Sequence, residues 1–301
     1  MKMDETGQPV ATTARWPRVW SVFAVFIISI MLYLVAAGVC MTLTAVALYR
    51  GPLNSEEDLR SAISDGIDSP VAVLAACAAA GAVLTGMSLL AAFLSPVPWR
   101  QRLNLRQPRI TAIGLLAAVL GTLSVSASLL GLDSLGLLPE SPALETIGEA
   151  ITALQGPSLL VGLLLIGVLP GISEELLFRG YVQTRLVSRW GVPVGVVISA
   201  FLFGLMHMDV TQGAFAMVIG LVLGYLTVWS GSIIPAMICH AANNSLAVLL
   251  MIYTPDLQKI EGLGSSLALV ATSIVVGSLS MWFLRNRGTQ RVTEETVPSI
   301  A

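Results

Sequence analysis

The sequence predicts an all-α membrane protein, a polytopic bundle of about eight transmembrane helices with both termini in the cytoplasm. Three observations predict this fold class. Of the 301 residues, 55% are hydrophobic and 11% are charged, whereas about 25% of the residues in a soluble domain are charged. About eight windows contain the roughly 20 apolar residues that a helix needs to cross a bilayer. The basic residues also concentrate in alternate connections.

Charged residues divide the chain into its expected elements. The apolar run from Val19 to Tyr49 is too long for the apolar part of a signal peptide, so we expect a retained first span. Residues 1–18 and 285–301 are expected to be cytoplasmic tails, and residues 19–284 to form one transmembrane bundle. The expected spans are residues 20–44, 71–97, 110–132, 158–180, 192–208, 211–229, 232–253 and 264–284.

The basic residues follow the positive-inside rule in this topology. With a cytoplasmic N-terminus, 13 of the 16 fall in cytoplasmic segments, and Arg50, Arg60 and Lys259 fall outside. The first two outer connections are acidic, and we interpret their carboxylates as solvated loop charges. The net charge of −2 argues against a nucleic acid partner. The localisation expected is integral to a membrane, with a prokaryotic cytoplasmic membrane as the hypothesis.

Two adjacent glutamates follow an uncharged stretch in the fourth span. On a helix, Glu175 and Arg179 are four residues apart and can pair, while Glu174 points about 100° away toward another neighbour. Ionisable residues inside spans cost at least a few kcal/mol at the bilayer centre. They are therefore candidates for function, with Arg179 expected to be a structural partner of Glu175.

Both histidines of the chain fall inside apolar spans. His207 follows Phe203 by four residues, and His240 precedes Asn244 by four, so each pair shares a helix face. A single membrane histidine or asparagine is often only a contact between helices. Here buried imidazole and amide groups on two spans need polar partners, and the glutamates of the fourth span are the obvious ones. We expect Phe203 to pack behind His207.

These motifs, Glu-Glu-x-x-x-Arg, Phe-x-x-x-His and His-x-x-x-Asn on successive spans, resemble the CPBP intramembrane proteases. That family includes CAAX prenyl endopeptidases and Abi-type bacteriocin-processing or immunity proteins. The resemblance covers residues 158–250. It implies a glutamic endopeptidase in which Glu174 and His207 activate water, and His240 and Asn244 stabilise the oxyanion. It also implies that Glu175 and Arg179 support the site.

The sequence leaves open whether the site binds a metal ion. Glu174, His207 and His240 offer donor types that suit zinc, but no H-E-x-x-H motif occurs and the residues come from three spans. We favour a site without an obligatory metal. The expected partners are the bilayer and a peptide or protein substrate, prenylated or otherwise membrane-anchored.

Two other functions use the same residues. A proton-coupled carrier would use the buried acids and imidazoles as a relay, although the sequence lacks the inverted repeats of many carriers. A non-catalytic immunity or partner protein would use them to hold the bundle together.

Overall fold

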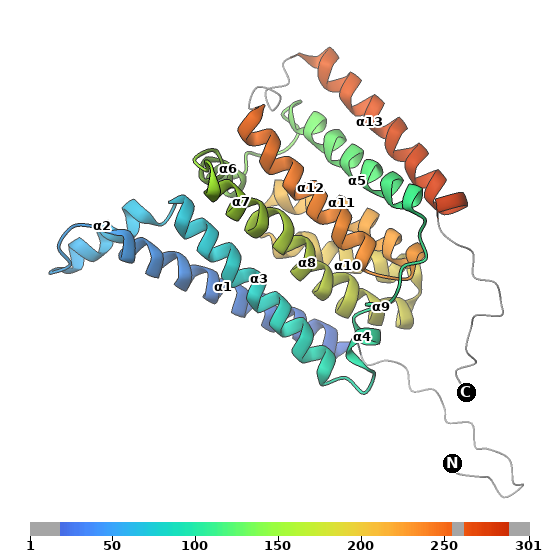
Figure 1. Ribbon diagram of the computed structural model, residues 1–301, viewed down its shortest axis with the longest axis horizontal. Helices are drawn as coiled ribbons and strands as arrows, with labels where there is room; N and C mark the ends of the chain where they lie inside the picture. Colours follow the sequence, from blue (N-terminus) through green and yellow to red (C-terminus); the bar gives the residue numbers. More distant parts are fainter. Residues whose placement is uncertain (1–18, 255–261, 289–301) are drawn as a thin grey trace, which may run out of the picture.

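The computed structural model describes residues 19–254 and 262–288, in which all regular structure is helical (Figure 1). The predicted all-α fold is therefore confirmed. The predicted tails, residues 1–18 and most of 285–301, lie outside the described residues. The elements are α1 (Trp20–Leu48), α2 (Glu56–Gly66), α3 (Pro70–Phe93), α4 (Trp99–Arg102), α5 (Ala112–Asp133), α6 (Pro142–Thr152), α7 (Pro157–Gly162), η1 (Leu163–Val168), α8 (Leu169–Glu175), η2 (Leu176–Val182), α9 (Gln183–Trp190), α10 (Val192–Met206), α11 (Val210–Ser230), α12 (Ile234–Tyr253), α13 (Leu263–Phe283) and η4 (Leu284–Gly288).

Seven helical stretches among the described residues are long and apolar enough to cross a membrane. They are α1, α3, α5, the continuous helix of residues 157–190, α11, α12 and α13 with its extension. The eighth expected span, at residues 192–208, corresponds to α10, which is apolar but has 15 residues. At about 1.5 Å per residue α10 is about 22 Å long, so it falls short of the other helices.

The helix of residues 157–190 lies in the centre of the bundle. α12 packs along η1 and α8, α3 packs along α8 and η2, and α10 and α11 also contact η2. α1 and α3 form an antiparallel pair at one side, and α5 and α13 form another at the opposite side (Figure 1). Residues that face inward from the central helix therefore meet α3, α10 and α12.

The fourth span is longer than expected, because its helix continues from residue 180 to Trp190. The added segment contains Arg185 and Arg189 and is polar, so hydropathy alone places the end of the span too early. Gly191, with φ of +81°, ends the helix in a conformation that favours glycine. Because the helix extends this far, Glu174 lies well inside it.

Two π-helical segments interrupt the central helix. η1 comes directly before Pro170, and η2 comes directly after Glu175. A proline inside an α-helix lacks an N–H donor and collides with the carbonyl group four residues earlier. The wider turn of η1 relieves this conflict, and η2 changes the rotation of the helix right after the two glutamates. π-Bulges of this kind are frequent at functional sites.

Glycines bring the central helices close together. A Cβ atom at Gly171 would lie 2.7 Å from the backbone nitrogen of Ala241 in α12. A Cβ atom at Gly220 would lie 3.2 Å from an Arg179 nitrogen, and one at Gly224 would lie 2.8 Å from the Gln183 side chain. Gly220 and Gly224 therefore let α11 approach the central helix closely.

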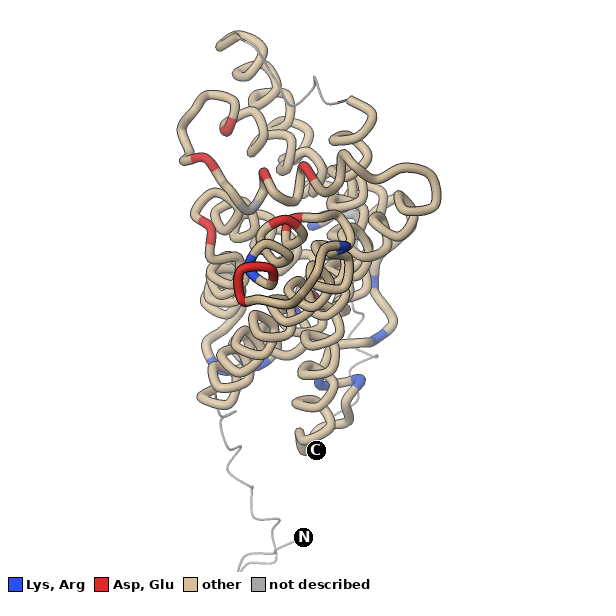
Figure 2. Tube along the Cα trace, turned by 90° about the vertical axis from the view of Figure 1, so that its left-hand side faces the viewer, with Lys and Arg blue, Asp and Glu red and all other residues tan. Residues whose placement is uncertain are grey.

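The acidic outer connections contain helices, so their interpretation as plain loops was wrong. Ser55 and Asp58 form a capping box that starts α2, and the Ser141 side chain caps α6. Acidic residues in the first turn also suit the helix dipole. Figure 2 shows most Asp and Glu toward one end of the bundle and most Lys and Arg toward the other. Arg179, counted above with the cytoplasmic basic residues, is instead buried inside the bundle.

Candidate active site

Glu175 is the centre of the buried polar cluster. Its Oε1 atom accepts a hydrogen bond from an Arg179 terminal nitrogen at 2.8 Å and from His240 Nδ1 at 2.9 Å. The side chains of Glu175 and Arg179 are fully buried, and that of His240 is 6% exposed. The predicted pair of Glu175 and Arg179 is confirmed, and Glu175 also connects η2 to α12.

Arg179 is held by more than this ion pair. Its guanidinium carbon lies 4.4 Å from the centre of the Phe203 ring, and Gly220 leaves the space beside it. Its Nε and second terminal nitrogen, and the Oε2 atom of Glu175, have no hydrogen-bond partner within the described chain. Buried polar atoms of this kind call for water. The cluster is therefore a polar interior that suits water.

Glu174 differs from its neighbour in both contact and exposure. Its Oε2 atom lies 3.8 Å from His240 Nε2, and its side chain is 15% exposed. It also lies within electrostatic range of Tyr33 in α1 and Cys77 in α3. The two adjacent glutamates lie beside different nitrogens of the same His240 ring, and only Glu175 also pairs with Arg179. Glu174 is the carboxylate that is open to a further ligand, whereas Glu175 is occupied by Arg179 and His240.

His207 follows the last residue of α10. Its Nδ1 atom lies 2.9 Å from the Phe203 carbonyl oxygen, which accepts its hydrogen bond. The Phe203 ring meets the His207 ring edge-on at 5.2 Å and the His240 ring edge-on at 5.7 Å. Phe203 thus packs against His207 as expected, and both imidazoles contact one aromatic ring. With Nδ1 donating, Nε2 of a neutral His207 ring is an acceptor.

Asn244 stands one turn after His240 on α12. Its side-chain oxygen accepts a hydrogen bond from the Asn243 amide at 3.4 Å, and among the described residues it makes no hydrogen bond with Glu174, His207 or His240. Asn243 accepts a hydrogen bond from Ser126, which connects α12 to α5. The structure therefore brings Glu174, Glu175, Arg179 and His240 together, with His207 at the edge of the cluster through Phe203.

Three residues near the cluster were not singled out from the sequence. Tyr33 and Cys77 reach Glu174 from α1 and α3, and Asp209 acts electrostatically on His207. A hydroxyl in an apolar span and a carboxylate two residues after a histidine were visible signals for Tyr33 and Asp209. Cys77 looked like any small apolar residue. These three residues are within electrostatic range of the site and come from segments outside the motifs.

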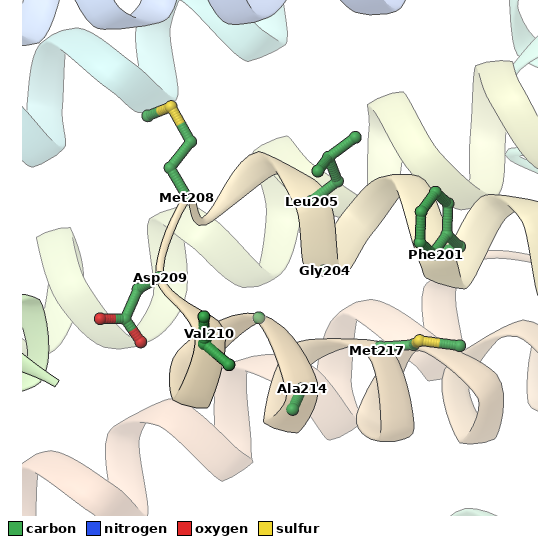
Figure 3. A pocket seen from close by; sticks show the side chains of 9 residues that line it. Phe201, Gly204, Leu205, Met208, Asp209, Val210, Ala214 and Met217 are labelled. Carbon is green, nitrogen blue, oxygen red and sulfur yellow. The ribbon is translucent and has the colours of Figure 1, made fainter. Parts of the chain in front are cut away.

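Asp209 also starts α11. Its side chain accepts a hydrogen bond from the Gln212 backbone at 2.7 Å, and these backbone hydrogen bonds lower its pKa. Met208, between His207 and Asp209, has φ of +52°. Figure 3 shows the adjoining hollow between α10 and α11, lined by Phe201, Gly204, Leu205, Met208, Asp209, Val210, Gly213, Ala214 and Met217. This hollow is almost wholly apolar and does not include the cluster.

The zinc alternative requires Glu174, His207 and His240 as a ligand group. In residues 19–254 and 262–288, no three His, Cys, Asp or Glu side chains form a group that could hold a metal ion. Nδ1 of His207 and Nδ1 of His240 are hydrogen-bonded to the Phe203 carbonyl oxygen and to Glu175, so Nε2 is the ring nitrogen that a metal ion would use. A site without an obligatory metal stays a prediction, and the chemical steps proposed for this site use the protein's own residues.

The fold and this cluster define a polytopic membrane protein with a buried acid and imidazole site. Residues 156–246 match the family model described as "Type II CAAX prenyl endopeptidase Rce1-like". The matched segment contains all six candidate residues and confirms the predicted resemblance to the CPBP and CAAX proteases. It indicates a membrane protease, a hydrolase that acts on a peptide or protein. No curated protein and no solved structure matches the chain.

Proposed function

We propose that this protein is an intramembrane endopeptidase that hydrolyses a peptide bond of a membrane-associated or lipidated substrate through water activated by Glu174 and His207. The observation that supports this most is the contrast between the two adjacent glutamates. Glu175 is fully buried and bonded to Arg179 and His240, whereas Glu174 retains 15% exposure. One carboxylate is thus structural and the other can receive water.

The available proton donors and acceptors are consistent with hydrolysis. A carboxylate in an apolar surround can serve as a general base, and the Nε2 acceptor of His207 can share the proton of the attacking water. Attack forms a bond from the water oxygen to the peptide carbonyl carbon, and the carbonyl oxygen becomes an oxyanion. Collapse of this intermediate breaks the C–N bond, and the proton held by Glu174 passes to the leaving amine.

His240 and Asn244 are the proposed oxyanion donors. With Nδ1 of His240 bonded to Glu175, its Nε2 side faces the space beside Glu174. A ring that donates from Nε2 as well carries both protons. The Asn244 oxygen already accepts from Asn243, so its amide N–H₂ is the group to donate. One such donor lowers the activation barrier by about 3–4 kcal/mol in other acyl-transfer enzymes.

Replacement of Glu174 by Gln tests this function. The variant should lose at least about 10³-fold in turnover, because Gln cannot accept the proton from water. The measurement is cleavage of prenylated and unprenylated membrane-anchored peptides by the purified full-length protein in vesicles, with melting temperature as a folding control. Ser128→Ala, on α5, is a matched control that should keep turnover within about twofold.

Retained turnover in Glu174→Gln would exclude this mechanism, and full biological activity of that variant would favour an immunity or partner role. Cleavage of the prenylated peptide alone would assign lipidated substrates. We also propose that the reaction needs no metal, so removal of zinc by a chelator should leave turnover unchanged. We place the protein in a prokaryotic cytoplasmic membrane, as a hypothesis from the basic cytoplasmic ends.

A further inference from the structure

A second polar site lies between α4 and the end of the central helix, away from the glutamates. Arg102 of α4 is 4% exposed, and its guanidinium carbon lies 3.9 Å from the centre of the Tyr181 ring. One terminal nitrogen donates to the Thr184 hydroxyl at 2.6 Å. Its Nε and other terminal nitrogen have no partner in the described chain. A buried guanidinium is thus left with two unused donors.

The neighbouring charge is also positive. Arg185 acts electrostatically on Arg102, and burial together with this charge lowers the pKa of Arg102 to about 10. No acidic residue occurs in residues 94–111, 183–195 or 225–240, which lie toward this end of the bundle. Two close arginines without an acidic partner repel each other, so an anion between them would relieve the repulsion and occupy the unused donors.

The position of the site selects the kind of anion. α4 and α9 lie together at the end of the bundle to which most arginines belong (Figures 1 and 2). Trp99 precedes the site with Arg100 over its ring at 5.2 Å, and tryptophan favours the level of lipid headgroups. Basic pockets between helices on the cytoplasmic side suit anionic headgroups.

We propose that Arg102 and Arg185 form a binding site for a phosphate group, supplied by an anionic phospholipid. Arg185 is partly buried and its hydrogen bond to Ser95 is long, at 3.4 Å. It is therefore the side chain that moves to admit the phosphate, while Arg102 is held by Tyr181 and Thr184. Tyr181 lies in η2, six residues after Glu175, and Arg185 lies in α9. A bound phosphate would therefore stabilise both segments.

The test uses the full-length protein in nanodiscs of phosphatidylcholine, with phosphatidylglycerol added in steps. Retained lipid is counted by native mass spectrometry and the melting temperature is followed in parallel. We expect one tightly retained phosphatidylglycerol. Arg185→Gln should weaken its apparent affinity at least about fivefold, the effect of one arginine near an anionic headgroup. Arg100→Gln is the control, because Arg100 is an exposed arginine of the same short helix. This substitution should change the apparent affinity less than about twofold.

A parallel titration with inorganic phosphate separates the two sources. Stabilisation by phosphatidylglycerol and not by millimolar phosphate assigns a lipid site, and equal stabilisation by both assigns a free phosphate ion to the same arginines. Arg102→Gln should behave like Arg185→Gln, and if it does not fold, Arg185→Gln alone decides. Equal retention of phosphatidylglycerol by wild type, Arg185→Gln and Arg100→Gln, without any effect of phosphate, would overturn the proposal.

Discussion

At the residue scale, adjacent glutamates have different environments because a helix turns about 100° per residue. Glu175 is hydrogen-bonded to Arg179 and His240, whereas Glu174 lies 3.8 Å from His240 without a hydrogen bond to it and is within electrostatic range of Tyr33 and Cys77. The pair therefore separates a structural role from a proposed chemical role within one dipeptide.

The ion pair of Glu175 with Arg179 should matter far more than its exposed counterpart. Glu175→Ala leaves the buried Arg179 charge without its partner, and we expect a cost of about 3–5 kcal/mol. Glu56 and Arg60 form the same i, i+4 pair at 2.7 Å on the surface of α2. Glu56→Ala should cost less than about 1 kcal/mol. Unfolding of both variants in detergent, followed by helical signal, measures the difference, and equal costs would contradict it.

Asp209 should give the protein an acid-sensitive contribution. Hydrogen bonds lower its pKa in the folded protein, so its stabilisation is present above its unfolded pKa of about 4 and is lost as the pH falls through the folded value. Asp209→Ala should cost about 1 kcal/mol at pH 7 through loss of the α11 cap. Asp209→Asn keeps a capping oxygen. Stability curves from pH 7 to 3 should show the acid-dependent loss in wild type and less of it in Asp209→Asn.

At the element scale, the site depends on how closely α8 approaches α12. A Cβ atom at Gly171 would collide with the Ala241 backbone, and one at Gly167, just before α8, would collide with the Ser245 hydroxyl. These contacts place Glu174 and Glu175 next to His240. The π-helical segments on both sides of α8 then set the direction in which the glutamates point.

Gly171→Ala tests this approach. The new Cβ would meet α12 backbone atoms at 2.7–2.9 Å, so α8 must shift, at a cost of about 1–3 kcal/mol. Turnover should fall as well, because Glu174 and His240 lie on the two separated helices. Gly86 of α3 has nothing within 4 Å of its added Cβ, and Gly86→Ala should be neutral or slightly stabilising. Melting temperature and peptide cleavage report the two effects, and an unaffected Gly171→Ala would refute the argument.

The sequence predicts the elements better than it predicts their ends and contacts. Apolar windows identify the spans, and residue spacing predicts the pair of Glu175 and Arg179. Hydropathy stops the fourth span ten residues early, because residues 181–190 are polar yet remain helical. The proximity of Glu174 to Tyr33 and Cys77 could not be predicted, since it depends on packing between residues more than 90 positions apart in the chain. The capping box of α2 and the Ser141 cap of α6 were visible in the sequence, but a hydropathy profile does not report them.

At the scale of the whole molecule, charge sets the direction of insertion. The basic ends of α4, α9 and η4 and the acidic helices α2 and α6 lie toward opposite ends of the bundle (Figures 1 and 2). Attraction of basic segments to the cytoplasmic face predicts that α9 is inside and α2 outside.

Thiol labelling tests this orientation. In a variant without Cys40, Cys77 and Cys239, a cysteine at the exposed Ser188 of α9 should react with an impermeant maleimide only after the cytoplasmic face is opened. A cysteine at the exposed Glu57 of α2 should react in intact cells. The reverse pattern would contradict the predicted topology.

The shortness of α10 has a consequence for the surrounding lipid. Its length of about 22 Å is less than the roughly 30 Å of hydrocarbon in a typical bilayer. Lipid tails beside it must compress to meet its ends, since an exposed mismatch costs fractions of a kcal/mol per Å. We expect the bilayer to thin beside α10 and to bring the headgroup layer closer to His207, which would shorten the path of water to the acid and imidazole groups.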